Sequence, residues 1–191
     1  MIKAIIFDCF GVILTDALQV LRSDVAQRRP EVAQRIDDIV RANNRGMLEP
    51  SESNQMIAEL LDMSVEELRG KVDAREVRDE KLLAYIQTLR AEYKIGLLSN
   101  IGVSSLEKRF SQTELDQYFD AVIVSGEVGY AKPEPEIYEI AADRLGVRLD
   151  ECLFTDDRPE YCEAARAIGM RAIPYESFVQ FEQALQSLLK K

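Results

Sequence analysis

The chain has 191 residues, of which 47% are hydrophobic, and its 34 acidic and 24 basic side chains give a formal net charge of −10. This balance predicts a globular protein with a substantial core and excludes a disordered or collagen-like chain. The acidic charge argues against non-specific nucleic-acid binding and against an anionic membrane surface, whereas local cations still allow an anionic small substrate.

Five short apolar runs predict buried β-strands, because each is rich in Ile, Leu, Val or Ala and ends at polar or turn residues. In chain order they cover residues 2–7, 94–99, 121–125, 152–155 and 170–174. Segments with the apolar spacing of helices follow them, at residues 77–89, 137–145, 161–168 and 178–188. The alternation predicts an α/β fold, a Rossmann-like parallel sheet covered by helices on both faces.

Residues 16–75 interrupt this alternation. They read as successive short amphipathic helices with no strand between them, separated by Pro30 and by the stretches NNRG (43–46) and LEPSES (48–53). This composition predicts a small all-helical insertion after the first strand. The α/β core would then comprise residues 1–15 and 76–191.

The absence of histidine restricts the chemistry available to the chain. It excludes Ser-His-Asp and Cys-His nucleophiles and His-ligated metal sites. The three cysteines, Cys9, Cys152 and Cys162, form no CxxC pair and fit reduced thiols. No signal peptide is apparent and no run reaches the roughly 20 apolar residues of a membrane span. We therefore expect a cytoplasmic protein with no membrane partner.

Polar residues follow four of the five predicted strands. They are Asp8, the pair Ser99 and Asn100, the stretch SGEVGYAKPEPE (125–136) and the stretch TDDRPE (155–160). Ligands of open parallel sheets bind at the carboxyl ends of the strands, so we expect these residues to converge on one site. Asp156 and Asp157 would concentrate negative charge near Asp8, and Mg²⁺, which prefers oxygen ligands, would relieve it.

Each of these residues also suits a purely structural role. Asp8 fits a carboxylate that caps a turn. Asp156 and Asp157 fit the N-terminus of the following helix, where the macrodipole favours negative charge. Ser99 and Asn100 fit a helix cap, and a lysine in a loop is ordinarily exposed. The residue types alone leave both interpretations open.

The stretches FDCFGV, LLSN, KPEPEIY and FTDD resemble, in order and spacing, the four motifs of the haloacid dehalogenase-like hydrolase superfamily. The resemblance spans nearly the whole chain. It implies that Asp8 is a nucleophile that attacks a phosphoryl group to form an aspartyl-phosphate, which water then hydrolyses. It also implies that residues 16–75 form that family's small cap domain.

The resemblance implies roles for the neighbouring residues as well. The Ser99 hydroxyl and backbone N–H groups near Asn100 would bind the phosphoryl oxygens, and Lys132 would neutralise the nucleophile and the transferred phosphate. The implied Mg²⁺ ligands are Asp8, the backbone carbonyl of Phe10, Asp156 and Asp157, with Asp157 preferred as a direct ligand.

Phe10 departs from the family pattern, because phosphatases of the superfamily usually carry a second aspartate there to protonate the leaving group. Its loss removes a contribution of about 10²–10⁴ in rate. Three functions stay open. One is a Mg²⁺-dependent phosphatase for leaving groups that need little protonation or use an acid from the cap. A second is a metal-free haloacid dehalogenase, since those members carry an aromatic residue at this position. The third is a weakly catalytic binding or regulatory module.

The paired acids Asp156 and Asp157 favour the phosphatase. We expect a small phosphorylated metabolite as substrate, a class that includes sugar phosphates, and a monomer or homodimer. Asn44, Arg45 and Met47, in a predicted loop of the insertion, are candidates for contact with the leaving group, because a closing lid contacts that part of a substrate.

Overall fold

The central sheet of the computed structural model, which describes residues 1–189, has five strands that all run parallel. They are β1 (Ala4–Phe7), β2 (Lys94–Ser99), β3 (Ala121–Val124), β4 (Cys152–Asp156) and β5 (Arg171–Pro174). Their order in the sheet is β3-β2-β1-β4-β5. The predicted α/β fold is confirmed, and the strands fall within two residues of their predicted bounds.

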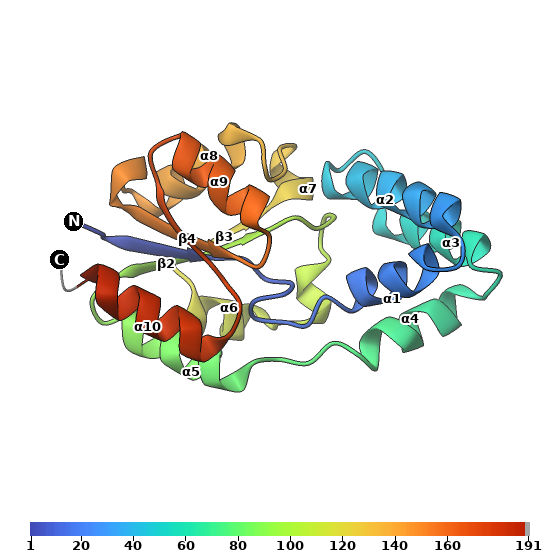
Figure 1. Ribbon diagram of the computed structural model, residues 1–191, viewed down its shortest axis with the longest axis horizontal. Helices are drawn as coiled ribbons and strands as arrows, with labels where there is room; N and C mark the ends of the chain where they lie inside the picture. The colour runs from blue at the N-terminus through green and yellow to red at the C-terminus, as the bar shows by residue number, and fades with distance from the viewer. Residues whose placement is uncertain (190–191) are drawn as a thin grey trace.

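Helices cover both faces of this sheet (Figure 1). One face carries α5 (Glu80–Leu89), α6 (Gln112–Tyr118) and α10 (Phe178–Leu189), and the other carries α8 (Pro135–Leu145) and α9 (Pro159–Ala167). Successive strand residues point to opposite faces, so Ile5 and Phe7 pack in one core and Ala4 and Ile6 in the other. A strand buried on both faces needs apolar residues at every position, which explains the unbroken run in β1.

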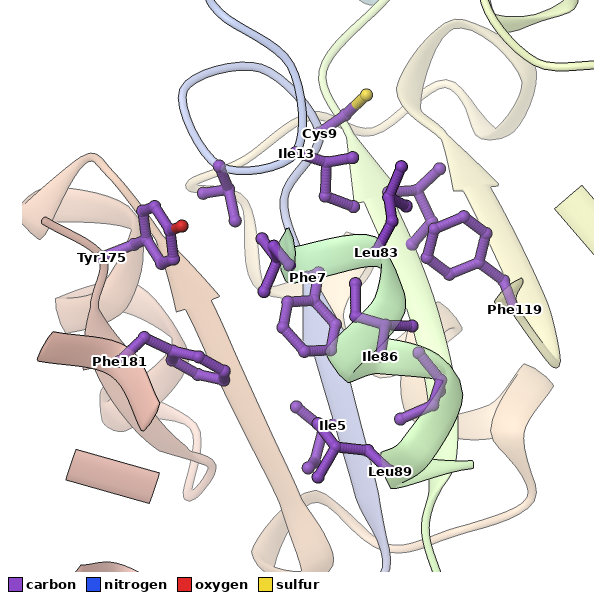
Figure 2. Close-up of a cluster of buried hydrophobic side chains, with 14 of the residues drawn as sticks. Ile5, Phe7, Cys9, Ile13, Leu83, Ile86, Leu89, Phe119, Tyr175 and Phe181 are labelled. Carbon is purple, nitrogen blue, oxygen red and sulfur yellow. The ribbon is translucent and has the colours of Figure 1, made fainter. Parts of the chain in front are cut away.

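The core under α5 shows how the sheet and its helices fit together. Figure 2 shows Leu83, Ile86 and Leu89 of α5 lying over Ile5 and Phe7 of β1. The ring of Phe7 meets that of Phe181 from α10 edge to face, with centroids 5.4 Å apart. This geometry suits the aromatic quadrupoles and ties α10 to the middle of the sheet.

Four further helices lie beyond the carboxyl ends of the strands (Figure 1). They are α1 (Ala17–Ala26), α2 (Pro30–Asn44), α3 (Pro50–Leu60) and α4 (Val65–Asp73), and we call them the four-helix unit. Proline begins both α2 and α3. It is tolerated there because an N–H group in the first turn of a helix has no intrahelical acceptor, so its absence costs no hydrogen bond. The buried core of the unit consists of its own residues, Val32, Ile36, Ile39, Ile57, Ala58 and Leu68. The unit therefore packs as a separate layer over the edge of the sheet.

The remaining elements are short. Helix α7 (Ser125–Val128) follows β3, and two 3₁₀ turns, η1 (Leu106–Lys108) and η2 (Leu149–Glu151), lie in connections. Among residues 1–189, no helix has the length and apolar character needed to cross a bilayer.

Replacing Ile86, which is fully buried, tests the core under α5. We expect Ile86→Ala to lower the free energy of unfolding by about 2–5 kcal/mol, because it removes buried methyl groups and leaves a cavity. Urea denaturation measures this change. Gln87→Ala on the exposed side of the same helix is the control and should shift stability by less than about 0.5 kcal/mol. Equal effects of the two substitutions would contradict the packing described.

Candidate active site

Three neighbouring strands bring the predicted polar residues to one edge of the sheet. Asp8 directly follows β1, Ser99 ends β2 and Asp156 ends β4. The β1–β4 register pairs Phe7 with Thr155, and the backbone N–H of Asp8 donates to the carbonyl of Thr155 at 2.9 Å. The sheet register therefore fixes Asp8 beside Asp156, and the expected convergence is present.

Lys132 lies between these carboxylates and is only 4% exposed. Its Nζ donates to Asp8 Oδ1 at 2.6 Å, to Asp156 Oδ2 at 2.7 Å and to the carbonyl of Leu98 at 3.2 Å. All three hydrogens of the ammonium group thus have acceptors. The loop that carries Lys132 is held by Asn100, whose Oδ1 accepts the backbone N–H of Lys132 at 2.8 Å and whose Nδ2 donates to the Lys132 carbonyl at 2.9 Å.

These contacts give Asn100 a role that the sequence did not predict, because its amide group positions Lys132. Asn100 also lines the cavity described below, so its predicted contact with phosphoryl oxygens stays a prediction.

Asp157 completes a cluster of three acids. One carboxylate oxygen from each of Asp8, Asp156 and Asp157 lies within 4.8 Å of the others. Gly11 makes room for this arrangement: its φ is +91°, and a Cβ atom there would lie 2.3 Å from Asp157 Oδ2. Three oxygen donors at this spacing fit a hard divalent cation such as Mg²⁺.

Burial and charge shift the pKa values of these groups. Burial raises the pKa of Asp8 to about 8, with Asp156 adding to the shift and Lys132 opposing it. Burial also raises the pKa of Asp157 to about 6, helped by Asp156. Burial lowers the pKa of Lys132, but Asp156 and Asp8 outweigh it and hold the pKa above its usual value. Lys132 therefore stays protonated, and its single positive charge does not balance the three carboxylates.

Ser99 carries an unpaired hydroxyl at the same edge. The residue is fully buried, and its Oγ is the one buried side-chain polar atom without a hydrogen-bond partner among residues 1–189. Leaving such a group unpaired costs about 1–3 kcal/mol, which a bound ligand would recover. The predicted contact between Ser99 and a phosphoryl oxygen would satisfy it.

Phe10 lies beside the cluster among a different set of contacts. The guanidinium of Arg109 stands over its ring, 5.1 Å from the centroid, and is paired with the carboxylate of Glu76, with Arg109 Nε 2.8 Å from Glu76 Oε2. Glu76 is therefore engaged by Arg109. The Glu76 carboxylate therefore does not take the place of the missing aspartate as a proton donor.

A cavity of about 790 Å³ separates the cluster from the four-helix unit. Asp8, Phe10 and Lys132 line it on the side of the sheet. Asn44 and Arg45 line it from the end of α2, where Arg45 also pairs with Glu134 at 3.1 Å.

Met47 requires a correction. It is 69% exposed and is not among the residues that line the cavity, because the chain turns away from α2 at Gly46, where φ is +69°. Asn44, for its part, belongs to the last turn of α2 and not to a loop.

Sequence reasoning missed a row of polar residues along the cavity. Asp16, Gln19 and Arg22 come from the start of α1, Asp37 from α2, and Arg158 from the turn after β4. The first three are spaced three residues apart and so share one face of a helix. That spacing could have indicated a polar helix face toward the site, but it is equally typical of a helix face toward solvent.

Comparisons with known proteins agree on a family. The family model for haloacid dehalogenase-like hydrolases matches residues 2–169. Phosphatase MT3486 of Mycobacterium tuberculosis is 35% identical over 54% of this chain, and this chain spans only 45% of that protein. D-ribitol-5-phosphate phosphatase of Bacteroides thetaiotaomicron is 26% identical over 99% of both chains.

A solved structure shares the fold. It is a HAD family enzyme from Bacteroides thetaiotaomicron in complex with magnesium and inorganic phosphate, with a TM-score of 0.75 and 24% identity over 93% of this chain and 96% of that one.

Removing the Lys132 ammonium tests the electrostatics of the cluster. We expect Lys132→Met, in EDTA at pH 9, to lower the free energy of unfolding by about 3–5 kcal/mol, because two buried carboxylates lose their cation. Burial raises the pKa of Asp8 to about 8 and Lys132 opposes that rise, so removing Lys132 raises this pKa further. The folded variant therefore keeps a proton at pH 9 that the folded original chain has mostly released, and its stability deficit relative to that chain should shrink as the pH falls from 9 to 7.

Chemical denaturation at the two pH values measures this effect. Lys94→Met is the control, because Lys94 forms an exposed pair with Asp120 at 3.5 Å and should matter little. A deficit that does not change with pH would contradict the charge balance described.

Proposed function

This chain belongs to the haloacid dehalogenase-like hydrolase family, and we propose that it is a Mg²⁺-dependent phosphatase acting on a small phosphorylated metabolite. The charge of the acid cluster supports this proposal most directly. When all three carboxylates are ionised, Asp8, Asp156, Asp157 and Lys132 together carry a net charge of −2. A divalent cation balances that charge, and the relatives named as phosphatases are consistent with it.

The proposed reaction has two steps. A carboxylate oxygen of Asp8 attacks phosphorus while the ester P–O bond breaks, giving an aspartyl-phosphate and an alkoxide, which takes a proton from solvent. Water then attacks the phosphorus while the P–O bond to Asp8 breaks, giving inorganic phosphate and the restored carboxylate, and the proton of the water passes to solvent. Lys132 holds the Asp8 oxygen in place, and the Ser99 hydroxyl binds a phosphoryl oxygen.

The proposed Mg²⁺ ligands are Asp8, the backbone carbonyl of Phe10, Asp156 and Asp157. When bound, the ion would neutralise charge on the phosphoryl oxygens and keep the Asp8 carboxylate ionised at neutral pH. The second effect matters here, because burial raises the pKa of Asp8 to about 8 when no cation is present.

Phe10 restricts the proposed substrates. The ring supplies no proton, and Glu76 beside it is engaged by Arg109. The leaving group must therefore depart with little protonation or find its donor elsewhere, as an anomeric sugar phosphate or an acyl phosphate would.

The same charge count disfavours the haloacid dehalogenase. Attack needs an ionised Asp8, and the cluster with all three carboxylates ionised carries −2, so a metal-free reaction would bring an anionic haloacid to a site that is already negative. Halide release without added metal would establish that activity in place of the phosphatase. Binding of Mg²⁺ with no turnover would indicate a binding module.

We further propose that residues 16–75 act as a cap over a core of residues 1–15 and 76–191. The four-helix unit faces the acid cluster across the cavity, and Asn44 and Arg45 reach that cavity from the unit. These two residues would contact the leaving group.

Asp8→Asn tests the nucleophile and the metal together. A screen of phosphorylated metabolites with and without Mg²⁺ should show phosphate release that needs the ion, and the variant should lose at least about 10³-fold in kcat. Asp116→Asn, on the exposed surface of α6, is the control and should keep its activity. Metal-independent turnover, or an Asp8→Asn variant as active as the original chain, would refute the proposal.

Phe10→Asp tests the missing proton donor. We expect it to raise kcat for esters of ordinary alcohols by up to about 10²–10⁴-fold, and to change acetyl phosphate hydrolysis little, because an acyl phosphate needs no protonation of its leaving group. Phe10→Asn is the matched control, since asparagine has the size of aspartate but no acidic proton. Equal rates for the Asp and Asn variants would mean that position 10 does not limit leaving-group departure.

A further inference from the structure

A connected row of polar side chains forms one wall of the cavity. The carboxylate of Asp16 accepts the backbone N–H of Gln19 at 2.9 Å and lies 4.0 Å from the guanidinium of Arg158. The side-chain oxygen of Gln19 accepts from both Arg158 and Arg22, and Arg22 pairs with Asp37 across α1 and α2. We call these five residues the α1 wall; all of them line the cavity.

The α1 wall leads from the acid cluster into the four-helix unit. At one end, the backbone N–H of Arg158 donates to Asp156 Oδ1 at 2.9 Å. At the other end, the side chains of Arg22 and Asp37 are 25% and 28% exposed, so they are open to the cavity although paired. A leaving group attached to a phosphoryl group at Asp8 would extend along this wall.

The charge of the wall indicates what it binds. Two guanidinium groups and two carboxylates, Arg22, Arg158, Asp16 and Asp37, sum to zero, so the wall itself has no excess cation, while Arg41, Arg69 and Lys108 line other parts of the cavity. It does offer donors and acceptors side by side. Neighbouring hydroxyl groups, each both donor and acceptor, match such an arrangement.

Other residues of the cavity lining support the same class of ligand. Leu18, Val40, Ile57 and Val72 supply apolar contact, and the polar side chains of Asn44, Ser53 and Asn54 also line the cavity. A carbon skeleton with hydroxyl groups fits this mixed lining.

A nucleobase fits the cavity poorly. Residues 16–75 contain no aromatic residue, so the four-helix unit has no ring on which a base can stack. The two rings in the lining, Phe10 and Tyr161, come from the sheet side and already have cations over them: Arg109 at Phe10, and Lys132 and Arg158 at Tyr161.

We propose that Gln19, Arg22 and Asp37 form a subsite for neighbouring hydroxyl groups of the leaving group, so that the substrate is the phosphate ester of a small sugar or sugar alcohol. This inference rests on the phosphatase proposed above. It adds the chemical class of the substrate and the residues that select it.

Arg22→Gln and Asp37→Asn test the subsite by comparing two substrates. With D-glucose 1-phosphate, each variant should raise KM by about 10- to 100-fold, as the loss of a hydrogen bond to a charged group does. With p-nitrophenyl phosphate, which has no hydroxyl on its leaving group, kcat/KM should stay within about twofold. Arg75→Gln and Asp24→Asn are matched controls, because this Arg–Asp pair, at 3.4 Å, also joins segments of the four-helix unit but lies outside the cavity lining.

A binding measurement separates this inference from the proposed function. Calorimetry on Asp8→Asn with Mg²⁺ should show tighter binding of D-glucose 1-phosphate or D-sorbitol 6-phosphate than of inorganic phosphate, and adding Arg22→Gln should abolish that margin. The inference would be overturned if Asp8→Asn bound these sugar phosphates no more tightly than inorganic phosphate, or bound GMP or a bisphosphate more tightly than either. It would also be overturned if Arg22→Gln and Asp37→Asn lowered kcat/KM equally on both substrates. Absence of any Mg²⁺-dependent turnover, with the margin intact, would overturn the phosphatase and leave the subsite standing.

Discussion

The buried ammonium of Lys132 is the interaction on which the rest of the site depends. A lysine this deeply buried is stable only if its charge is balanced and its hydrogens are accepted. Asp8 and Asp156 provide the charge, and the Leu98 carbonyl provides the third acceptor. These groups come from β1, β4 and β2, so the parallel register of three strands determines where Lys132 sits. The ammonium in turn fixes the carboxylate of Asp8.

The charge balance is incomplete once Asp157 is included. One ammonium cannot neutralise three acids, and the third, Asp157, approaches only because residue 11 is glycine. A cluster with more acids than cations binds a cation favourably, and burial, with Asp156 adding to it, raises the pKa of Asp8 until such a cation is present. Metal binding and activation of the nucleophile are therefore one electrostatic property of the cluster.

Local patterns predicted the sheet and the convergence of Asp8, Ser99 and Asp156, because apolar runs and strand ends are encoded within a few residues. The burial of Lys132 is different: a lysine in a loop is usually exposed, and only its family resemblance marked it. The amide contacts of Asn100 and the position of Met47 depend on how distant loops pack. Gln19 and Arg22 were overlooked for the same reason, since a polar face of α1 is equally expected toward solvent or toward a cavity.

Phe10 and the α1 wall place complementary demands on a leaving group. Phe10 gives no proton, so the departing oxygen must be stable as an anion, and a hemiacetal oxygen meets this demand better than that of an ordinary alcohol. The wall offers paired donors and acceptors without net charge, which matches neighbouring hydroxyl groups. An aldose phosphorylated at its anomeric carbon has both properties in one molecule. The chemistry that the site lacks and the contacts that it offers thus select the same kind of substrate.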